Sequence, residues 1–470
     1  MKREDVLIPE AALASQREFE DKVRAMFAAR EAHPLACVDT FGCQQNVADG
    51  QKLMGMLERM GFAFTGEPGE ADLVILNTCA VREHAEQRVF GNLGILTHTK
   101  RENPEQIVAL CGCMAQEPRV SQRVRASYRH VDLVFGPHAL WKFPELLCRV
   151  YETGKRVFSV DEEHGSIAEG IPVVREGGVK AWVSVMYGCN NFCSYCIVPY
   201  VRGRERSRDP RCVLEEVREL VEAGYRDITL LGQNVNSYGN DLEIAYDFAD
   251  LLAEIDQIPG EYLIRFMSSH PKDATKKLFD TMARCGHVAK QLHLPFQSGN
   301  DRVLREMNRR YTRAQYLELV NYARQVMPGL VVTSDVIIGF PGETEAEAMD
   351  TVSLVEEVGF DALFTFIYSP RPGTKAAELP DPAPRAEKQK WFDRLLEVQN
   401  ARSAALHAGY VGQVLRVLVD GKSGDGDFPL SSRTEGNRLV RLTGDEKLIG
   451  QFINVRITGS NTWALYGEPA

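Results

Sequence analysis

The sequence predicts an α/β protein with three globular parts, and three patterns indicate this. In the central part, short apolar strands alternate six times with amphipathic helices, which is typical of a parallel sheet curled into a partial (β/α)6 barrel. The amino-terminal third carries strand–loop–helix units typical of a doubly wound parallel sheet. After residue 408, β-forming residues are separated by Gly, Asp and Ser turns, which indicates a small antiparallel barrel.

Hydrophobic periodicity gives the expected bounds of these elements. The central strands are expected at 181–186, 227–231, 263–267, 291–294, 331–338 and 362–367. The helices are expected at 213–223, 248–255, 275–284, 313–326, 345–358 and 385–407. The amino-terminal strands are expected at 38–40, 73–76 and 107–110, and the carboxyl-terminal strands at 414–419, 437–442, 451–458 and 462–466.

Composition limits the class of protein. A chain of 470 residues with 44% hydrophobic residues supports two or three domains. Eleven cysteines are too few for a disulfide scaffold, and their odd number favours free thiols and metal ligation in a reducing compartment. The sequence contains no apolar run of the ~18 residues that a membrane span needs. Residues 1–5 lead into a charged helical pattern instead of a signal peptide, so we expect a cytoplasmic protein.

Three cysteines, Cys189, Cys193 and Cys196, follow the first central strand in the spacing CxxxCxxC. Three thiolates can hold three corners of a [4Fe–4S] cluster and leave one iron open to a ligand. A zinc site or three unrelated buried thiols are the alternatives that the spacing leaves open. The motif resembles the signature of the radical S-adenosylmethionine (SAM) superfamily, in which the open iron chelates SAM.

The later central strands are each followed by a polar or Gly-rich segment, where ligands of such barrels bind. Glycines let a backbone approach a ligand, and Ser, Gln and Asn offer neutral hydrogen bonds, although each segment alone could be an ordinary turn. The resemblance implies that these segments and the cysteine loop contact SAM. The candidate cofactor-binding residues are Tyr195, Gln233, Asn234, Ser268, Ser269, Gln297, Ser298, Asp335 and Phe340.

A second cysteine set lies in the amino-terminal third. Cys43, Cys79 and Cys113 each follow a strand candidate, so their loops are expected to meet at one edge of the sheet. Three thiolates there can hold a second cluster, but buried cytosolic cysteines are common. Cys111 competes with Cys113 for the same role.

The motifs together resemble the radical SAM methylthiotransferases over most of the chain, from about residue 38 to residue 467. The matching segments are 40–46, 77–81, 112–116, the cysteine loop and 339–344. Segments 231–239, 307–312 and 368–374 are most similar to the MiaB branch of this family. Gln45 and Gln51 depart from the pattern of that branch, where Met and Glu are expected, and neither is a candidate cluster ligand.

The resemblance implies a flavodoxin-like amino-terminal domain, a radical SAM partial barrel and a carboxyl-terminal TRAM domain that binds RNA. It implies an auxiliary [4Fe–4S] cluster on Cys43, Cys79 and Cys113, and a SAM-binding [4Fe–4S] cluster on Cys189, Cys193 and Cys196. The expected boundaries are 1–33 for a helical extension, 34–152, 175–405 and 408–470, with a link within 154–178.

The activity that the resemblance implies is the addition of a methylthio group to carbon 2 of N6-isopentenyl(dimethylallyl)adenosine next to the anticodon of tRNA. One SAM supplies the methyl group, a second supplies a 5′-deoxyadenosyl radical, and the auxiliary cluster holds the sulfur. An aromatic carbon–hydrogen bond is not acidic enough for ordinary acid–base catalysis, which is why a radical is needed. An electron donor such as flavodoxin and a monomeric state are expected.

A net charge of −10 is unusual for a protein that binds RNA. A local basic segment with Arg202, Arg204, Arg206 and Arg208 follows the cysteine loop, and we expect these four side chains to contact RNA phosphates. A second basic stretch lies within 302–313. Either stretch could instead be a solvated or ion-paired surface.

Three other functions remain open at this point. The same chemistry could act on threonylcarbamoyl-adenosine of tRNA or on an aspartate of a ribosomal protein, as in sister branches. The chain could be a non-enzymatic iron–sulfur protein that binds RNA. It could also catalyse another radical SAM reaction and use its auxiliary cluster only for electron transfer.

Overall fold

The computed structural model describes residues 6–29, 33–80, 83–160, 165–175 and 177–470. Residues 1–5, Val81 of the segment 77–81, and parts of the predicted link (161–164 and 176) lie outside the described residues. The chain forms two compact units, and each is described by itself. The first unit comprises residues 1–176, 186–190 and 196–208, and the second comprises 177–185, 191–195 and 209–470.

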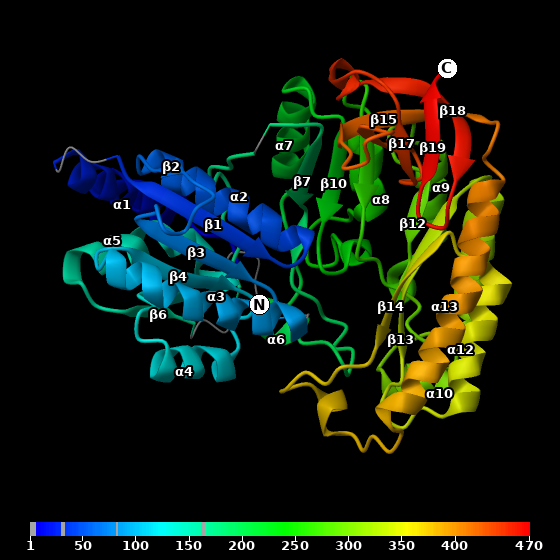
Figure 1. Cartoon of the computed structure of the whole chain (residues 1–470), viewed down its shortest axis with the longest axis horizontal. Coiled ribbons are helices and arrows are strands. Elements are labelled where there is room, and N and C mark those ends of the chain that lie inside the picture. Colours follow the sequence, from blue (N-terminus) through cyan, green and yellow to red (C-terminus); the bar gives the residue numbers. More distant parts are fainter. Residues whose placement is uncertain (1–5, 30–32, 81–82, 161–164, 176) are drawn as a thin grey trace. The chain divides into compact units, whose positions relative to one another are not determined.

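The first unit contains a six-stranded parallel sheet in the order β2-β1-β3-β4-β5-β6 (Figure 1). This is the flavodoxin-like order, so the prediction for the amino-terminal fold is confirmed. Its strands are β1 (Leu35–Phe41), β2 (Ala63–Phe64), β3 (Leu73–Thr78), β4 (Ile107–Gly112), β5 (Leu133–Phe135) and β6 (Val157–Ser159). Its main helices are α1 (Glu10–Ala28), α2 (Gln44–Arg59), α3 (Glu83–Glu102), α4 (Pro118–Ser127) and α5 (Phe143–Thr153).

Two hydrophobic clusters enclose this sheet. One includes Val23 of α1, Leu53 of α2 and Leu147 of α5. The other includes Leu93 of α3 and Val120 of α4. All residues of β3 and β4 are buried, as expected for a parallel sheet with helices on both faces. Three short elements of the first unit come from the segment around the cysteine loop: β8 (Met186–Tyr187), α6 (Val198–Arg202) and β9 (Arg206–Ser207).

The second unit contains two three-stranded parallel sheets, in the orders β11-β10-β7 and β12-β13-β14. A bridge between Ile264 and Val288 connects them, which gives the predicted partial barrel of six strands. The strands are β7 (Lys180–Ser184), β10 (Asp227–Leu231), β11 (Leu263–Phe266), β12 (Gln291–His293), β13 (Val331–Ile338) and β14 (Ala362–Ile367). The helices are α7 (Pro210–Glu222), α8 (Phe248–Ile255), α9 (Lys276–Arg284), α10 (Asp301–Glu306), α11 (Arg313–Val326), α12 (Glu345–Val358) and α13 (Arg385–Ala408).

Capping boxes define where three of these helices begin. The pairs Asp247–Asp250, Thr312–Gln315 and Thr344–Glu347 exchange side chain-to-backbone hydrogen bonds at the starts of α8, α11 and α12. Such a box satisfies two N–H groups that a helix terminus leaves unpaired. The predicted bounds of these three helices agree with the structure.

Residues 409–470 form a closed antiparallel-rich barrel in the order β15-β16-β17-β19-β18, as predicted. Its strands are β15 (Val414–Lys422), β16 (Leu430–Thr434), β17 (Leu439–Leu442), β18 (Phe452–Ser460) and β19 (Leu465–Pro469). Val417, Val440 and Leu465 lie in its core. Across the part of the chain that the structure describes, no helix has the length and apolarity to cross a membrane.

The small barrel docks on the amino ends of the partial-barrel strands (Figure 1). Lys180, at the start of β7, pairs with Asp420 at 2.5 Å. The backbone N–H of Lys290, just before β12, donates to Glu435 at 3.1 Å. Asp361, just before β14, pairs with Arg438. The small barrel therefore lies at the end of the strands opposite to the polar segments that follow them.

Arg265 of β11 is the central contact of this junction. Its Nε donates to Asp227 of β10 at 3.0 Å and its Nη1 to Gln291 of β12 at 3.2 Å. Its guanidinium also donates to the carbonyl oxygens of Thr434 and Glu435 in the small barrel, at 3.1 and 2.5 Å. One buried side chain thus connects three strands of the partial barrel with the small barrel.

Replacing Arg265 by Met is expected to lower the free energy of unfolding by about 3–5 kcal/mol, because the buried Asp227 carboxylate would lose its counter-charge. The side chains of this pair are only 5% and 4% exposed. Arg416→Met is the matched control, since Arg416 and Glu261 also join the two barrels but are 57% and 59% exposed. Its expected loss is below about 1 kcal/mol. Urea unfolding of both variants measures the difference, and equal losses would contradict the assignment.

Candidate functional site

The three cysteines of the amino-terminal set lie at the carboxyl edge of the first sheet. Cys43 follows β1, Cys79 follows β3 and Cys113 follows β4, and these strands are parallel neighbours. Loops after parallel strands meet at one edge, and the β1/β3 position is where the strand order reverses, which is the usual ligand site of this fold. The structure therefore brings together three residues that are far apart in the sequence.

The loops that carry Cys43 and Cys79 are in close contact. A Cβ added to Gly42 would lie 2.6 Å from Cβ of Cys79, so only glycine allows this approach. A hydrogen bond with the Cys79 thiol, followed by the charge on Arg202, lowers the pKa of Cys43 to about 6 against the effect of burial. Asn46 accepts from the Cys43 thiol at 3.3 Å and donates to the carbonyl oxygen of Thr78 at 3.0 Å.

Arg202 binds the third cysteine. Its Nε lies 3.0 Å from Sγ of Cys113, and its Nη2 lies 2.7 Å from Oδ2 of Asp49. Gln45 donates to the other oxygen of Asp49 at 3.1 Å, so a buried chain of polar contacts runs from the Cys43 loop to Cys113. Burial raises the pKa of Cys113, and the charge on Arg202 opposes this rise.

The structure favours Cys113 over Cys111. Cys111 belongs to the hydrophobic core, and burial raises its pKa well above its usual value. Cys113 instead packs beside Ala80, Ile197 and Val201 and has a guanidinium at its sulfur. A cation at the sulfur stabilises a thiolate, which is the form that binds iron.

The donor set fits an iron–sulfur cluster better than a single metal ion. Three soft thiols at one edge, one of them paired with a buried cation, are the ligands that iron–sulfur clusters use. Within the described ranges, no three Cys, His, Asp or Glu side chains are close enough together to hold one ion. A four-iron cluster accepts ligands that are farther apart, because each thiolate binds a different iron.

Three of the four arginines predicted to contact RNA are buried and have partners within the protein. Arg202 binds Cys113 and Asp49, as described above. Arg206 donates to the carbonyl oxygens of Arg202 and Arg204 at 3.1 and 2.7 Å, and Arg208 pairs with Glu169 at 2.7 Å. Only Arg204 has an exposed side chain.

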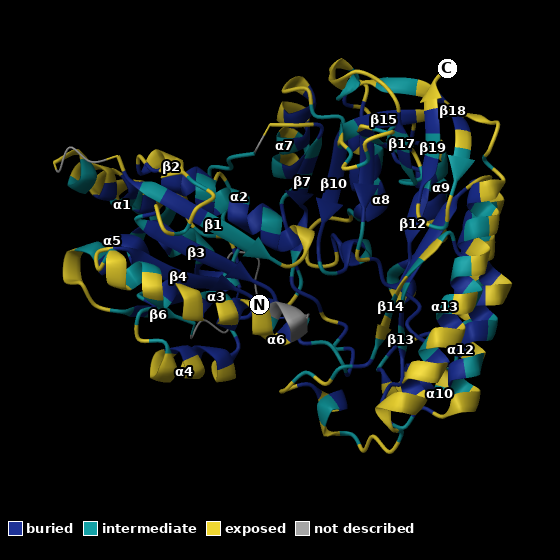
Figure 2. Ribbon diagram, in the orientation of Figure 1, coloured by how far each residue is buried: buried dark blue, intermediate teal, exposed yellow. Residues whose placement is uncertain are grey.

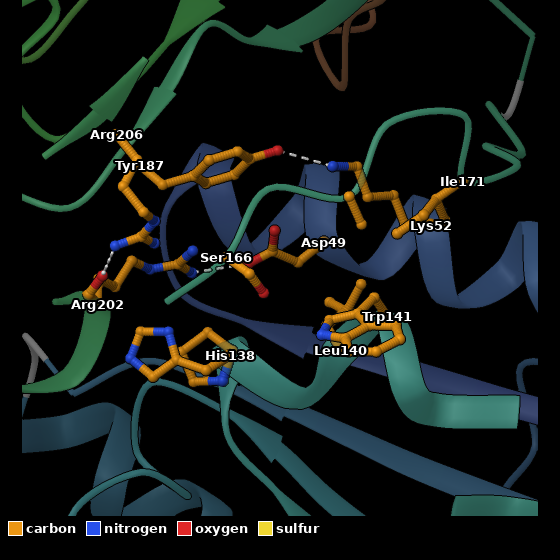
Figure 3. A pocket seen from close by; sticks show the side chains of 12 residues that line it. Asp49, Lys52, His138, Leu140, Trp141, Ser166, Ile171, Tyr187, Arg202 and Arg206 are labelled. Carbon is orange, nitrogen blue, oxygen red and sulfur yellow. Dashed lines mark hydrogen bonds and ion pairs between the residues drawn. The ribbon is translucent and has the colours of Figure 1, made fainter. Parts of the chain in front are cut away.

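A small cavity lies beside Arg202 and Arg206, and Figure 3 shows both guanidinium groups directed toward it. Asp49, Lys52 and His138 also line it. Its volume of about 40 Å³ is room for a few water molecules and is too small for a nucleotide. This basic cluster is therefore part of the interior of the first unit.

In the second unit, residues 191–195 of the cysteine loop are held by the loop after α10. Asn308 donates to the carbonyl oxygens of Asn191 and Phe192 at 3.1 and 2.9 Å, and Ser194 donates to that of Glu306 at 2.7 Å. Nη1 of Arg309 lies 3.6 Å from Sγ of Cys193. Cys189 and Cys193 are buried, and Cys196 is partly exposed.

Arg309 belongs to the second basic stretch of the sequence, within 302–313, and its side chain is buried. It donates to the carbonyl oxygen of Pro295 at 2.5 Å and to the hydroxyl of Tyr311 at 3.0 Å. Arg302 and Arg313 of the same stretch pair with Glu347 and Glu357. Sequence reasoning missed the contact between Arg309 and Cys193, although the segment 307–312 had been singled out as a family motif.

Most of the unfavourable backbone conformations lie in the loops of the predicted SAM site. Among the described residues, five that are not glycine have a positive φ, and Phe192, Ser268, Gln297 and Asn308 are four of them. Such conformations are costly and concentrate at functional sites. Two of the four, Ser268 and Gln297, are predicted cofactor contacts.

Among the buried polar atoms without a hydrogen-bond partner in the described part of the chain, three belong to predicted cofactor contacts. They are Oδ1 of Asn234, Oγ of Ser269 and Oε1 of Gln297, which follow β10, β11 and β12 in turn. Burying such atoms without partners is unfavourable, so a polar ligand is expected to pair with them. This arrangement fits the ribose and the amino-acid end of SAM.

The other predicted contacts lie around the same strand ends. Tyr195 packs in a cluster that includes Phe340 and Tyr368. Asp335 lies 3.5 Å from Nε2 of His293. Gln233 is half-buried and Ser268 is exposed, whereas Ser298 is buried with its hydroxyl beside that of Thr351. Ser298 therefore has a structural partner already.

Glu343 fixes the loop after β13. Its Oε2 accepts hydrogen bonds from the backbone N–H groups of Gly339 and Phe340 at 2.5 and 3.1 Å. Burial raises the pKa of Glu343 to about 7 despite these bonds. The side chain thereby positions Phe340 in the cluster that contains Tyr195.

Comparison with family models agrees with these three parts. Residues 36–136 match a family described as Uncharacterized protein family UPF0004. Residues 183–355 match the radical SAM superfamily, and residues 409–470 match the TRAM domain.

Comparison with solved structures supports the fold. The radical SAM methyltransferase TsrM from Kitasatospora setae, solved with cobalamin and a [4Fe–4S] cluster, matches with a TM-score of 0.54 and 17% identity. The match covers 74% of this chain and 77% of TsrM. A partial barrel with a CxxxCxxC loop and this superfamily match define a radical SAM enzyme.

Two curated relatives narrow the family further. The tRNA-2-methylthio-N(6)-dimethylallyladenosine synthase of Acetivibrio thermocellus is 47% identical over 99% of this chain and 98% of the relative. The protein of the same name from Alkaliphilus oremlandii is 48% identical over 92% of each chain. The chain therefore belongs to the tRNA-2-methylthio-N6-dimethylallyladenosine synthase family, the MiaB branch of the methylthiotransferases, as the motifs predict.

The raised pKa of Glu343 predicts a pH-dependent stability. Between its usual pKa of 4.5 and about 7 the folded state keeps the proton that the unfolded state releases. This stabilising contribution is complete below 4.5 and is lost as the pH rises through about 7. Glu343→Gln, which cannot ionise, is therefore expected to be more stable than the unsubstituted chain by about 3 kcal/mol at pH 8.

Urea unfolding of both proteins at pH 5 and pH 8 measures this. At pH 5 the two are expected to differ by less than about 1 kcal/mol. Glu347→Gln is the control, because the pKa of Glu347 is lowered to about 2 by its hydrogen bond with Arg302, so it remains ionised across this range. A pH-independent difference for Glu343→Gln would show that the carboxyl does not titrate in this interval.

Proposed function

We propose that this chain adds a methylthio group to carbon 2 of N6-dimethylallyladenosine beside the anticodon of tRNA. The observation that carries the proposal is the presence of two separate three-cysteine sets, each with a buried arginine at one sulfur, in a chain that matches synthases of this name over nearly its full length. The proposed reaction needs a source of radicals and a source of sulfur, and the two cysteine sets offer one site for each.

In the proposed reaction, the carbon–hydrogen bond at carbon 2 is replaced by a bond to sulfur. The hydrogen leaves on the 5′-deoxyadenosine made from one SAM, the methyl group comes from a second SAM, and a reductant such as reduced flavodoxin supplies the electrons. When bound, clusters with an open iron supply the electron for SAM cleavage and the sulfur for transfer.

The residues of this chain then have defined roles. Cys189, Cys193 and Cys196 hold the SAM-binding cluster, and Cys43, Cys79 and Cys113 hold the auxiliary one. The unpartnered oxygens of Asn234, Ser269 and Gln297 bind polar groups of SAM. Tyr195, Gln233, Ser268, Asp335 and Phe340 complete the cofactor surface, and Ser298 supports it through Asn300, whose N–H donates to its hydroxyl at 3.3 Å. The TRAM barrel provides affinity for tRNA.

We also infer the boundaries and the setting of the protein. The helical extension is placed at 1–33, the auxiliary-cluster domain at 34–152, the radical SAM domain at 175–405 and the TRAM domain at 408–470. The protein is proposed to act as a monomer in the cytoplasm, where tRNA and its electron donor are found.

The decisive experiment is an anaerobic assay of the reconstituted protein with SAM, reductant and prenylated tRNA, followed by mass spectrometry of the digested nucleosides. A methylthio increment on dimethylallyladenosine is expected. Formation of 5′-deoxyadenosine without this product would show that the chain cleaves SAM as a radical enzyme but acts on another substrate. The candidates would then be threonylcarbamoyl-adenosine and the ribosomal-protein aspartate. Absence of both 5′-deoxyadenosine and the methylthio product would favour a non-enzymatic RNA-binding protein.

Cys113→Ala tests the auxiliary site in the same assay. Its iron content is expected to fall from about eight to about four atoms per chain, and methylthio product is expected to disappear while SAM cleavage continues. Cys148→Ala is the matched control, because Cys148 is a buried cysteine of the same unit that lies in the hydrophobic core. Full iron and product in Cys113→Ala would reject the assignment.

Arg204 is the remaining candidate phosphate contact of its segment. Arg204→Ala is expected to weaken tRNA binding and to reduce the slope of log K against log salt by about 0.7–0.9, the change for one lost phosphate contact. Arg208→Lys serves as the control, since Arg208 is buried against Glu169. Fluorescence anisotropy at several salt concentrations measures both slopes, and identical slopes would remove Arg204 from the RNA interface.

A further inference from the structure

Strand β14 forms one side of the sheet β12-β13-β14, and its side chains alternate between two faces. Register places Phe364 beside Asp335 and Phe366 beside Ile337 of β13. Ser334, Val336 and Ile338, on the opposite face of β13, are fully buried. Helix α13 packs against β13 and β14, so the buried face is the one that helices cover.

The face with the two phenylalanines is open. Phe364 is 50% exposed and Phe366 is 49% exposed, whereas strands of a parallel sheet are normally buried on both faces. In Figure 2, β14 carries exposed residues beside the largely buried β13. Two large aromatic side chains on an uncovered inner face need a ligand or a partner to explain them.

This open face is continuous with the predicted SAM site of the same unit. Ile337, the neighbour of Phe366, packs in the cluster that includes Tyr195 of the cysteine loop. Asp335, the neighbour of Phe364, is a predicted cofactor contact, and the ring of His293 lies 5.7 Å from that of Phe364. The open face and the predicted SAM site therefore share the strand β13.

We propose that Phe364 and Phe366 bind the dimethylallyl-adenine of the tRNA, one ring stacking on the base and the other contacting the branched five-carbon chain. This inference rests on the proposed function. Alternate residues of a strand are about 6.6 Å apart, so two rings at such positions form one continuous apolar surface. Aromatic rings stack on any unpaired base, and an apolar surface favours the hydrocarbon substituent.

The same surface explains discrimination between sister substrates. Threonylcarbamoyl-adenosine carries an ionised carboxylate, which is costly to bring against two phenyl rings without a cation. Asp335, the register neighbour of Phe364, is acidic and would repel that carboxylate, and its side chain lies 3.5 Å from His293. The dimethylallyl chain is uncharged and buries only hydrocarbon.

The test uses the reconstituted enzyme with both clusters and the double variant Phe364→Ala/Phe366→Ala. The KM for prenylated tRNA is expected to rise about 10- to 100-fold, because one lost stacking or apolar contact changes discrimination by roughly this factor. The preference for a prenylated over an unmodified anticodon stem-loop, measured by fluorescence anisotropy, is expected to fall toward one. SAM cleavage without RNA is expected to be unchanged.

Two further variants keep the test decisive. Phe364→Leu/Phe366→Leu keeps the apolar volume and loses the rings, so an intermediate KM is expected even if the alanine variant folds poorly. Ile95→Ala removes a 63% exposed apolar side chain on α3 and is expected to have no effect. Unchanged KM and unchanged preference in the phenylalanine variants would overturn the proposal, and so would a loss of RNA-free SAM cleavage.

Failure of this inference is distinguishable from failure of the proposed function. If the unsubstituted enzyme makes no methylthio product from prenylated tRNA, the proposed function fails. If it makes the product and prefers the prenylated stem-loop, but the phenylalanine variants behave identically, only the role of these two residues fails.

Discussion

Both candidate sites depend on one constraint: parallel neighbouring strands end at the same edge, so the loops that follow them meet. In the first unit this brings together Cys43, Cys79 and Cys113 from three separate loops. In the second it places polar residues after β10, β11 and β12 in adjacent positions. Helical crossovers impose this direction on the strands, which is why residues scattered along a long sequence form compact sites.

The two cysteine sets share a second feature that the strand arrangement does not impose. Each has one sulfur in contact with a fully buried guanidinium, from Arg202 or Arg309. Asp49 balances the charge on Arg202, whereas the recorded oxygen partners of Arg309 are the neutral carbonyl of Pro295 and the hydroxyl of Tyr311. Since opposite charge stabilises a thiolate, Arg202 favours the form of Cys113 that binds iron.

Local signals determined which parts of this protein could be predicted from its sequence. Hydrophobic periodicity predicted helices α8, α11 and α12 to the residue, and in the structure capping boxes fix their starts. Strands β5 and β6 were missed because three residues show no periodicity, and β16 because its sequence, Leu-Ser-Ser-Arg-Thr, is polar. The burial of Arg202 and Arg208 could not be predicted for a different reason: charge runs are usually solvated, and the thiol and carboxylate partners of these residues are far away in the sequence.

The TRAM barrel and the predicted SAM site lie at opposite ends of the partial-barrel strands. The TRAM barrel contacts the amino ends of the partial-barrel strands, through Arg265, Lys180 and Asp361, while the cysteine loop and the unpartnered polar atoms lie at the carboxyl ends. The strands of the partial barrel have three to eight residues and span about 10–26 Å. In the proposed function, a base at the carboxyl ends is separated from the TRAM barrel by the length of these strands, so the TRAM barrel would hold another part of the same RNA. The exposed rings of β14 lie on the inner face of the partial barrel, which is the surface proposed above to bind the modified base.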